Sequence, residues 1–240
     1  MTLFSSSDII CDFDGTVTPV DTTDLILSRF ALPQWEEIES QWVSGLISSR
    51  ECMCRQVGLL RTDEKSLNAL IDEIPLADGF EEFMLFAKNY DLRLHIVSDG
   101  LDYVIRRILS NYGISGIPVT ANRLMMTGDR YELEFPHSQS SCGSGVCKCA
   151  VAEEIGQRIF LIGDGRTDIC LSDHADMILS RRGMPLESHC REMGLPYHSF
   201  SDFYDVVTFF ENCSGTVPDP GQYLNHQAIH QALKAASRNK

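Results

Sequence analysis

The sequence predicts a doubly wound α/β fold, in which helices cover both faces of a parallel sheet and a small helical cap is inserted after the first strand. The main observation is a pattern that occurs three times, an apolar run that ends in polar residues and glycine: IICDFDG (9–15), LRLHIVSDG (92–100) and RIFLIGDG (158–165). Helix-like segments alternate with these runs, which is typical of a Rossmann-like parallel sheet. Such sheets bind ligands beyond the carboxyl ends of their strands, and here the polar residues follow all three runs.

The remaining core elements fit the same alternation. LDYVIRRILSNYG (101–113) is typical of a helix that ends at a glycine, and RTDICLSDHA (166–175) of a shorter one. ADMILSR (175–181) and PYHSF (196–200) are strand-like. GFEEFMLFAKNYD (79–91) predicts a helix before the second strand, and the segment between 119 and 136 predicts a hairpin around its Thr-Gly-Asp-Arg turn.

Residues 21 to 77 carry helix signals and no convincing strand. Pro33 suits the first turn of one helix, Ser48 or Ser49 suits the N-cap of the next, and Thr62 that of a third. Three or four short helices at this point form a cap beside the sheet. We therefore divide the chain into an α/β core (1–17 and 78–213), a helical cap (18–77) and a linker with a C-terminal tail (214–240), to which no function is assigned.

Composition excludes several kinds of partner. The 240 residues are 43% hydrophobic and carry a formal net charge of −14, whereas nucleic acids and anionic membranes are bound mainly by lysine and arginine. No apolar run reaches the roughly 18 residues of a membrane span, and the N-terminus has no basic start followed by a long apolar stretch. These features predict a cytoplasmic protein that binds a small molecule; they do not predict its oligomeric state.

The nine cysteines do not suggest a disulfide framework, because an odd number cannot pair completely. Reduced thiols are the better interpretation. Cys142, Cys147 and Cys149 lie close together behind His137, and three readings of this cluster stay open: a structural zinc site, a redox-sensitive loop, or inert packing.

Acidic residues follow three strands that the fold would place side by side. They are Asp12 and Asp14 after the first, Asp99 (with Ser98) after the second, and Asp164 and Asp168 after the third. Carboxylates gathered in one crevice repel one another unless a cation compensates them. Mg²⁺ prefers oxygen ligands and commonly combines a few carboxylates with a substrate phosphate, so the pattern predicts a magnesium site.

These residues resemble the haloacid dehalogenase superfamily of aspartate-nucleophile phosphatases. Its first motif, hhhDxDGT, is similar to IICDFDGT; its second, an apolar strand ending in serine or threonine, to LHIVSDG; its fourth, GDxxxD, to GDGRTD. The third motif is a lysine at the start of a helix, for which Lys148 in CKCAVAEEIG is the candidate. The helical insertion and the 119–136 hairpin look like those of the phosphoserine phosphatase branch.

Within that branch, FPHSQSSCGSGVCKC (135–149) and the segment 175–206 resemble most closely the methionine-salvage phosphatases that act on 2-hydroxy-3-keto-5-methylthiopentenyl-1-phosphate. The related phosphoethanolamine/phosphocholine phosphatases share a cysteine-rich approach to the lysine. The resemblance covers residues 9–213.

The resemblance implies a mechanism. Asp12 attacks phosphorus and forms an aspartyl-phosphate, while Asp14 protonates the leaving alcohol and then activates water. The metal is held by Asp12, Asp164 and the backbone carbonyl of Asp14. Asp168 holds a metal-bound water or orients Lys148.

The same resemblance implies how the phosphate is bound. The residues that bind the phosphate oxygens are expected to offer hydrogen-bond donors or a positive charge. These are Ser98, Asp99, Gly100 and Lys148.

Cap residues choose the substrate in this superfamily, and here the sequence leaves alternatives open. The charged candidates are Glu36, Glu37, Glu39, Arg50, Glu51 and Arg55, and the candidates for an apolar pocket are Trp35, Trp42, Leu46 and Met53. Phosphoserine, phosphoethanolamine and phosphocholine are alternative substrates. A phosphotransferase such as a mutase and a catalytically silent binding domain of the same fold are alternative functions, although the complete set of motif residues weighs against the latter.

Overall fold

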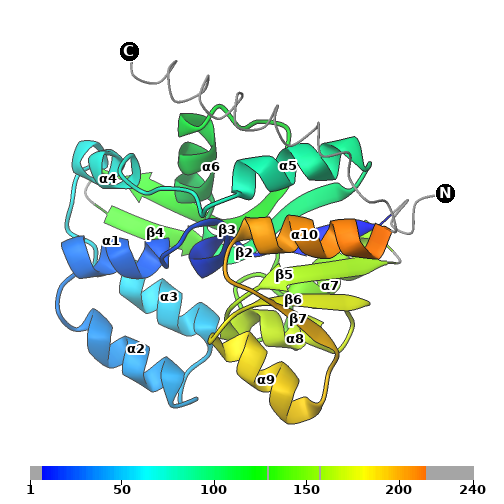
Figure 1. Ribbon diagram of the computed structural model, residues 1–240. Coiled ribbons are helices and arrows are strands. Elements are labelled where there is room, and N and C mark those ends of the chain that lie inside the picture. The colour runs from blue at the N-terminus through cyan, green and yellow to red at the C-terminus, as the bar shows by residue number, and fades with distance from the viewer. Residues whose placement is uncertain (1–6, 129, 157, 215–240) are drawn as a thin grey trace.

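A seven-stranded sheet forms the centre of the computed structural model, which describes residues 7–214 except 129 and 157 (Figure 1). The strand order is β4-β3-β2-β1-β5-β6-β7, and all neighbouring strands are parallel except β3 and β4. The strands are β1 (Asp8–Cys11), β2 (Arg93–Leu101), β3 (Val119–Thr127), β4 (Arg130–Glu134), β5 (Ile159–Gly163), β6 (Met177–Arg181) and β7 (Tyr197–Phe200). The predicted α/β sheet and its antiparallel hairpin are confirmed.

Side chains alternate between the two faces of the sheet, as the two-residue period of a strand requires. In β1, Ile9 and Cys11 belong to one apolar cluster and Ile10 to another. The first cluster is covered by α5 (Phe80–Asn89), α6 (Asp102–Asn111) and α10 (Phe203–Ser214); the second by α7 (Lys148–Ile155), α8 (Ile169–Ser172) and α9 (Pro185–Met193). Both faces are thus buried, which explains why β1 and β5 are apolar apart from Asp8 at the start of β1.

Four α-helices lie between β1 and α5 in the chain and are gathered beside the sheet (Figure 1). They are α1 (Thr22–Phe30), α2 (Trp35–Val43), α3 (Ser49–Val57) and α4 (Glu64–Ile71). Of the two serines considered for the N-cap of α3, Ser48 takes this role, and its hydroxyl oxygen accepts the N–H of Glu51 at 3.2 Å. The prediction for α4 was wrong by one residue: the Asp63 carboxylate, not Thr62, accepts the N–H of Ser66 at 2.7 Å.

The apolar cluster on the first face continues from the sheet into these four helices. Ile26 and Leu27 of α1 and Leu67 of α4 belong to the same cluster as Ile9 and Phe83. The boundary at residues 17 and 78 therefore crosses one apolar core, and the division into core and cap stays a prediction.

The sequence did not predict α9 and α10 as helices. The predicted linker and tail lie outside the described residues, apart from Ser214 at the end of α10. Among the described helices, none combines the length and apolar character that crossing a bilayer requires.

Candidate active site

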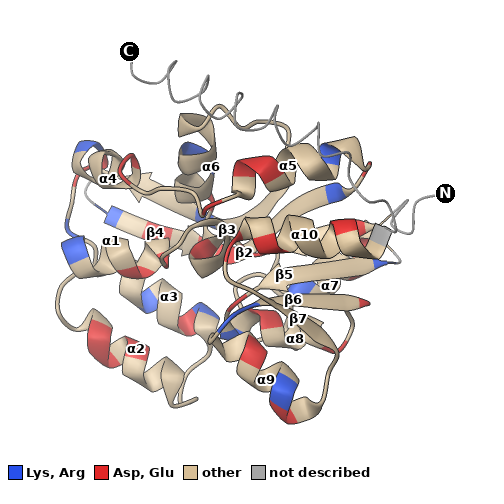
Figure 2. Ribbon diagram, in the orientation of Figure 1, with Lys and Arg blue, Asp and Glu red and all other residues tan. Residues whose placement is uncertain are grey.

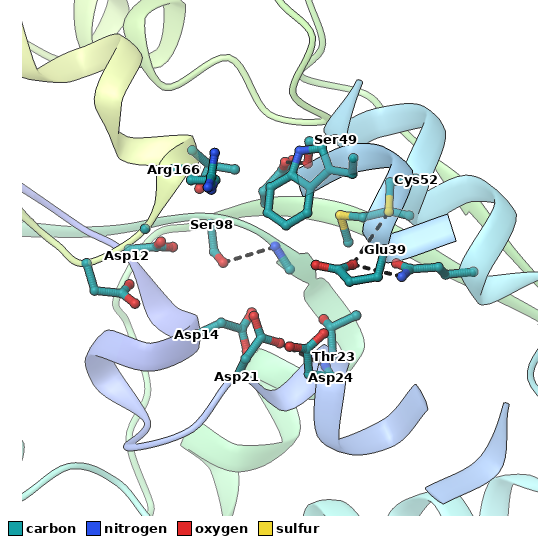
Figure 3. A pocket seen from close by; sticks show the side chains of 18 residues that line it. Asp12, Asp14, Asp21, Thr23, Asp24, Glu39, Ser49, Cys52, Ser98 and Arg166 are labelled. Carbon is teal, nitrogen blue, oxygen red and sulfur yellow. Dashed lines mark hydrogen bonds between the residues drawn. The ribbon is translucent and has the colours of Figure 1, made fainter. Parts of the chain in front are cut away.

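A cavity of about 130 Å³ opens where β1, β2 and β5 end, at the edge that the sequence predicted (Figure 3). The strand ends and the segment after β5 form one part of its lining, and the inserted helices form the other. The first group is Asp12, Asp14, Ser98, Asp99, Gly100, Asp164, Gly165, Arg166 and Thr167. The second is Asp21, Thr23, Asp24, Glu39, Trp42, Ser49, Cys52, Met53 and Gln56.

Asp12 and Lys148 form a buried ion pair at the bottom of this site. β1 ends at Cys11, and the next residue, Asp12, keeps an extended backbone and accepts the N–H of Phe13 at 2.8 Å. Lys148 is the first residue of α7 and is completely buried, with its Nζ 2.9 Å from Oδ2 of Asp12 and 2.5 Å from Oδ1 of Asp168. Burial opposes the lysine charge, but these two carboxylates outweigh it and raise the pKa of Lys148.

Asp168 contacts the lysine directly, as expected for one of the two roles predicted for it, and that role stays a prediction. Its Oδ2 accepts the backbone N–H groups of Asp164 and Gly165 at 3.1 and 3.0 Å, while Oδ1 faces Lys148. These three donors fix the carboxylate in one orientation. A Cβ atom at Gly163 would lie 2.5 Å from Oδ2 of Asp168, so this close approach requires glycine.

Asp164 follows β5 directly and accepts a hydrogen bond at 3.0 Å from the hydroxyl of Thr16. Thr16 belongs to the DFDGT motif, yet no role was predicted for it. Burial raises the pKa of Asp164 to about 8, and the charges of Asp12 and Asp168 add to this. Burial followed by the charge of Asp168 likewise raises the pKa of Asp12 to about 7, although Lys148 partly offsets this.

Asp14 points into the cavity from the turn after β1 (Figure 3). Its Oδ1 accepts the N–H of Thr22 at 2.9 Å as well as the Thr22 hydroxyl, so the start of α1 holds the side chain. Burial and the charge of Asp21 raise the pKa of Asp14 to about 8. A Cβ atom at Gly100 would lie 2.1 Å from Oδ2 of Asp14, so glycine is needed there to make room for the carboxyl group.

The predicted phosphate-binding residues of the second motif differ in what their polar groups contact. Ser98 is buried on the cavity wall and accepts the N–H of Gly100 at 3.0 Å. The carboxylate of Asp99 accepts hydrogen bonds from the Ser49 hydroxyl at 2.6 Å and the Val146 N–H at 2.9 Å. Asp99 therefore links α3 to the segment before Lys148, and phosphate binding by this residue stays a prediction.

The donor set fits a hard divalent cation. Carboxylate oxygens of Asp12, Asp164 and Asp168 lie within 4.8 Å of one another, the only such group of three or more potential metal ligands in the described part of the chain. Asp12 and Asp164 line the cavity and Asp168 does not, so Asp12 and Asp164 are the candidate ligands. One lysine cannot neutralise three buried carboxylates, and a divalent cation would supply the missing charge.

The cysteine cluster is joined by Cys170 of α8. The Cys149 thiol donates to the backbone oxygen of Cys170 at 2.9 Å, and burial raises the pKa of Cys149 to about 12. Among the described residues, no three of the thiols are close enough to share a metal ion, and all nine cysteines are free. Of the three readings, packing beside Lys148 agrees best with this arrangement.

Only some of the predicted substrate-contacting residues reach the cavity. Glu39, Trp42 and Met53 line it, whereas the other candidates, including Arg50 and Arg55, do not belong to its lining. The sequence did not suggest Asp21 and Asp24. Their spacing of three at the start of α1 is that of a helix N-cap, and Asp21 does cap α1 by accepting the N–H of Asp24 at 2.9 Å.

Comparison with known proteins decides the family. The model of the family described as Putative Phosphatase matches residues 8–202. The chain belongs to this phosphatase family. A 2-hydroxy-3-keto-5-methylthiopentenyl-1-phosphate phosphatase of Bacillus velezensis is 31% identical over 212 residues, which are 85% of this chain and 89% of that protein. The phosphatase of the same name from Geobacillus kaustophilus is 31% identical over 208 residues, 83% of this chain and 93% of that protein.

Solved structures support the same fold. A haloacid dehalogenase-family hydrolase from Salmonella enterica serovar Typhi superposes with a TM-score of 0.69 at 21% identity, over 86% of this chain and 71% of that one. A phosphoserine phosphatase described as a phospho-aspartyl intermediate analogue gives a TM-score of 0.65 at 21% identity, over 85% of this chain and 99% of that one. The predicted resemblance to the haloacid dehalogenase superfamily is confirmed.

Proposed function

We propose that the chain is a Mg²⁺-dependent phosphomonoesterase that hydrolyses the phosphate ester of a small metabolite through an aspartyl-phosphate on Asp12. The observation that carries the proposal is the position of Asp12. Its carboxylate lies at the floor of an open cavity, 2.9 Å from a fully buried lysine and beside Asp164. A carboxylate that only stabilised the fold would have no reason to face a cavity together with two further acidic groups.

In the first step a carboxylate oxygen of Asp12 attacks phosphorus, and the bond from phosphorus to the leaving alcohol oxygen breaks. Asp14 protonates that oxygen. In the second step Asp14 takes a proton from water, and the water oxygen attacks the phosphorus of the aspartyl-phosphate. The bond from phosphorus to the Asp12 oxygen breaks, which releases inorganic phosphate and regenerates Asp12. The contacts with Thr22 hold Asp14 at the cavity wall, two residues beyond Asp12, where it can serve both steps.

Phosphoryl transfer depends mainly on positioning and charge neutralisation. Lys148 holds Asp12 in place and faces the developing negative charge, while the Ser98 hydroxyl is placed to bind a phosphate oxygen. Asp12, Asp164 and the backbone carbonyl of Asp14 would hold Mg²⁺, which supplies positive charge to the phosphate oxygens when bound.

The cavity volume of about 130 Å³ suits a small leaving group. The two relatives that are 31% identical to this chain are named as phosphatases of 2-hydroxy-3-keto-5-methylthiopentenyl-1-phosphate, and this compound is one candidate substrate. The cytoplasm, as the place where the protein acts, stays a prediction.

A panel of phosphate monoesters assayed with Mg²⁺ or with EDTA tests the proposal, with inorganic phosphate as the readout. Asp12→Asn should abolish phosphate release, and EDTA should do the same to the wild-type protein. The control is Asp173→Asn, which makes the same change at an exposed position after α8. Hydrolysis by Asp12→Asn would contradict the nucleophile assignment.

The panel also separates the alternative functions. Release of phosphate without an acceptor alcohol excludes a mutase. A silent binding domain would release none from any ester.

A further inference from the structure

The turn that carries Asp14 is bound by a distant arginine to which the proposed mechanism gives no role. Arg181 is the last residue of β6, and Figure 2 shows basic residues where this strand ends. In the sheet, β5 lies between β6 and β1. The Nη1 group of Arg181 nevertheless donates to the backbone oxygen of Gly15 and, at 3.4 Å, to that of Thr18. The arginine side chain therefore extends past the end of β5 to the segment that follows β1.

Arg181 supplies donors to carbonyl groups that the fold has removed from water. Gly15 and Thr18 are both buried, and a buried backbone oxygen without a donor is unfavourable. Elsewhere in this segment a backbone group serves the same purpose: the oxygen of Val17 accepts the N–H of Ala77 at 2.8 Å. A guanidinium group presents its N–H donors in a rigid plane, so one arginine can bind two carbonyl groups in a fixed geometry.

Gly15 is held on both sides by these contacts. Its N–H donates to the backbone oxygen of Val20 at 3.1 Å, and its carbonyl oxygen accepts from Arg181. The N–H of Gly15 and the C=O of Asp14 belong to one planar trans peptide group and point in opposite directions. Fixing Gly15 therefore fixes the direction of the Asp14 carbonyl, which is one of the groups proposed to hold Mg²⁺.

The same turn is bound from β5 as well. The hydroxyl of Thr16 donates to Oδ1 of Asp164 at 3.0 Å, and a Cβ atom at Gly15, where φ is +69°, would lie 2.5 Å from Oδ2 of Asp164. Gly163 of β5 pairs with Ser180 of β6, so Asp164 and Arg181 follow at the same level of the sheet. The turn is thus enclosed by the carboxylate of Asp164 and the guanidinium group of Arg181.

Arg181 does not belong to the cavity lining, so it acts through the turn and not on the substrate. The next residue, Arg182, provides a contrast. It is exposed, and its Nε donates to the hydroxyl of Ser199 at 3.4 Å, on the neighbouring strand β7. Of these two adjacent arginines, only Arg181 contacts the turn after β1.

We propose that Arg181 is a positioning residue for the phosphatase reaction. It holds the peptide group between Asp14 and Gly15 so that the Asp14 carbonyl faces Mg²⁺ while the Asp14 carboxyl group stays at the cavity wall. This inference rests on the proposed phosphatase function and adds a residue outside the four sequence motifs.

The test compares Arg181→Met, Arg181→Lys and the matched control Arg182→Met in an assay of phosphate release at varied Mg²⁺. Arg181→Met should lower kcat about 100-fold with little change in KM, because the catalytic acid and a metal ligand are misplaced. The Mg²⁺ concentration for half-maximal activity should rise about tenfold to a hundredfold, as when a group that orients a metal ligand is lost. Arg181→Lys should give intermediate values, and Arg182→Met should match the wild-type protein.

A purely structural arginine would give a different result. Arg181→Met would then have a lower melting temperature but the same kcat and Mg²⁺ requirement per folded molecule, and this outcome would overturn the inference. If Arg181→Met does not fold, Arg181→Lys decides, because one ammonium group does not reproduce the guanidinium geometry. A Mg²⁺ requirement equal to that of the wild-type protein would then count against the inference.

Binding of Mg²⁺ separates this inference from the proposed function. If no ester is hydrolysed, the proposed function fails, and melting curves at increasing MgCl₂ concentrations then decide the role of Arg181. The concentration that produces half of the stabilisation should be about tenfold higher for Arg181→Met than for Arg182→Met. Equal concentrations, or a wild-type protein that Mg²⁺ does not stabilise, would overturn the inference.

Discussion

Replacing Lys148 by methionine tests the electrostatic account of the site, because it removes the charge and keeps a long side chain. Lys148 is fully buried between Asp12 at 2.9 Å and Asp168 at 2.5 Å. Removing one partner of a buried ion pair leaves an uncompensated charge and costs about 3–5 kcal/mol. For a protein of this size the melting temperature should fall by roughly 6–20 °C. The loss of a charged donor should also lower kcat about 100- to 1000-fold.

The pH dependence separates charge from packing. When folding raises the pKa of a carboxyl group, the protein loses stability as pH rises from the pKa of that group in the unfolded state to its pKa in the folded state. The folded-state pKa is about 7 for Asp12. Lys148 lowers the pKa of Asp12, so this pKa should be higher in the variant. Ionisation of Asp12 should therefore continue to destabilise the variant above pH 7, where it no longer destabilises the wild-type protein further. The stability difference should therefore grow by about 1.4 kcal/mol for each pH unit above this point.

The measurement is chemical denaturation in EDTA at about pH 6 and about pH 8.5, with Lys88→Met as the control at an exposed lysine of α5. Equal stability differences at the two pH values would show that Lys148 contributes by packing alone. That result would refute the electrostatic reasoning.

Three further predictions concern the site and its surroundings. Metal-free protein should lose stability as pH rises from about 4, the ordinary pKa of a carboxyl group, to about 8, because Asp12, Asp14 and Asp164 have raised pKa values of about 7, 8 and 8 in the folded state. Mg²⁺ should restore it, and melting curves with EDTA or Mg²⁺ check both effects; melting temperatures that rise with pH in EDTA would be the contrary result. Gly100→Ala should lower kcat about 100-fold, because the new Cβ would lie 2.1 Å from Oδ2 of Asp14, whereas Gly58→Ala, with its nearest neighbour at 3.6 Å, should have little effect. Protein purified without chelator should contain no stoichiometric zinc and nine titratable thiols; one bound zinc per chain would contradict the packing interpretation of the cysteine cluster.

The strand ends were predictable because each carries its own local signal. An apolar run followed by a small or acidic residue and glycine marks the end of a buried strand, and this placed Asp12, Ser98 and Asp164 at one edge of the sheet. Lys148 depended on the resemblance to a family, because a lysine before a helix has no distinctive pattern by itself. Its burial between two carboxylates appears only in three dimensions.

The acidic residues on the inserted-helix side of the cavity, Asp21, Asp24 and Glu39, could not all be predicted from the sequence, for a physical reason. Asp21 and Asp24 carry the spacing of a helix cap, and Asp21 does act as one, so the local signal was correct and incomplete. Glu39 was one of several acidic residues of α2, and only the packing of that helix shows which one faces the cavity. The link from Ser49 to Asp99 joins residues 50 positions apart, which no local pattern reveals.

The apolar cluster shared by the sheet and the inserted helices has a consequence for protein engineering. Ile26 and Leu27 lie within two turns of Asp24 on α1, and they pack in the same cluster as the sheet residues Ile9 and Ile96. Transplanting residues 18–77 from a relative to change specificity would therefore also replace the residues that these helices contribute to the shared cluster. A chimera that folds would need inserted helices and a sheet whose apolar residues in this cluster fit one another. Substrate preference in this chain therefore cannot be exchanged independently of its folding.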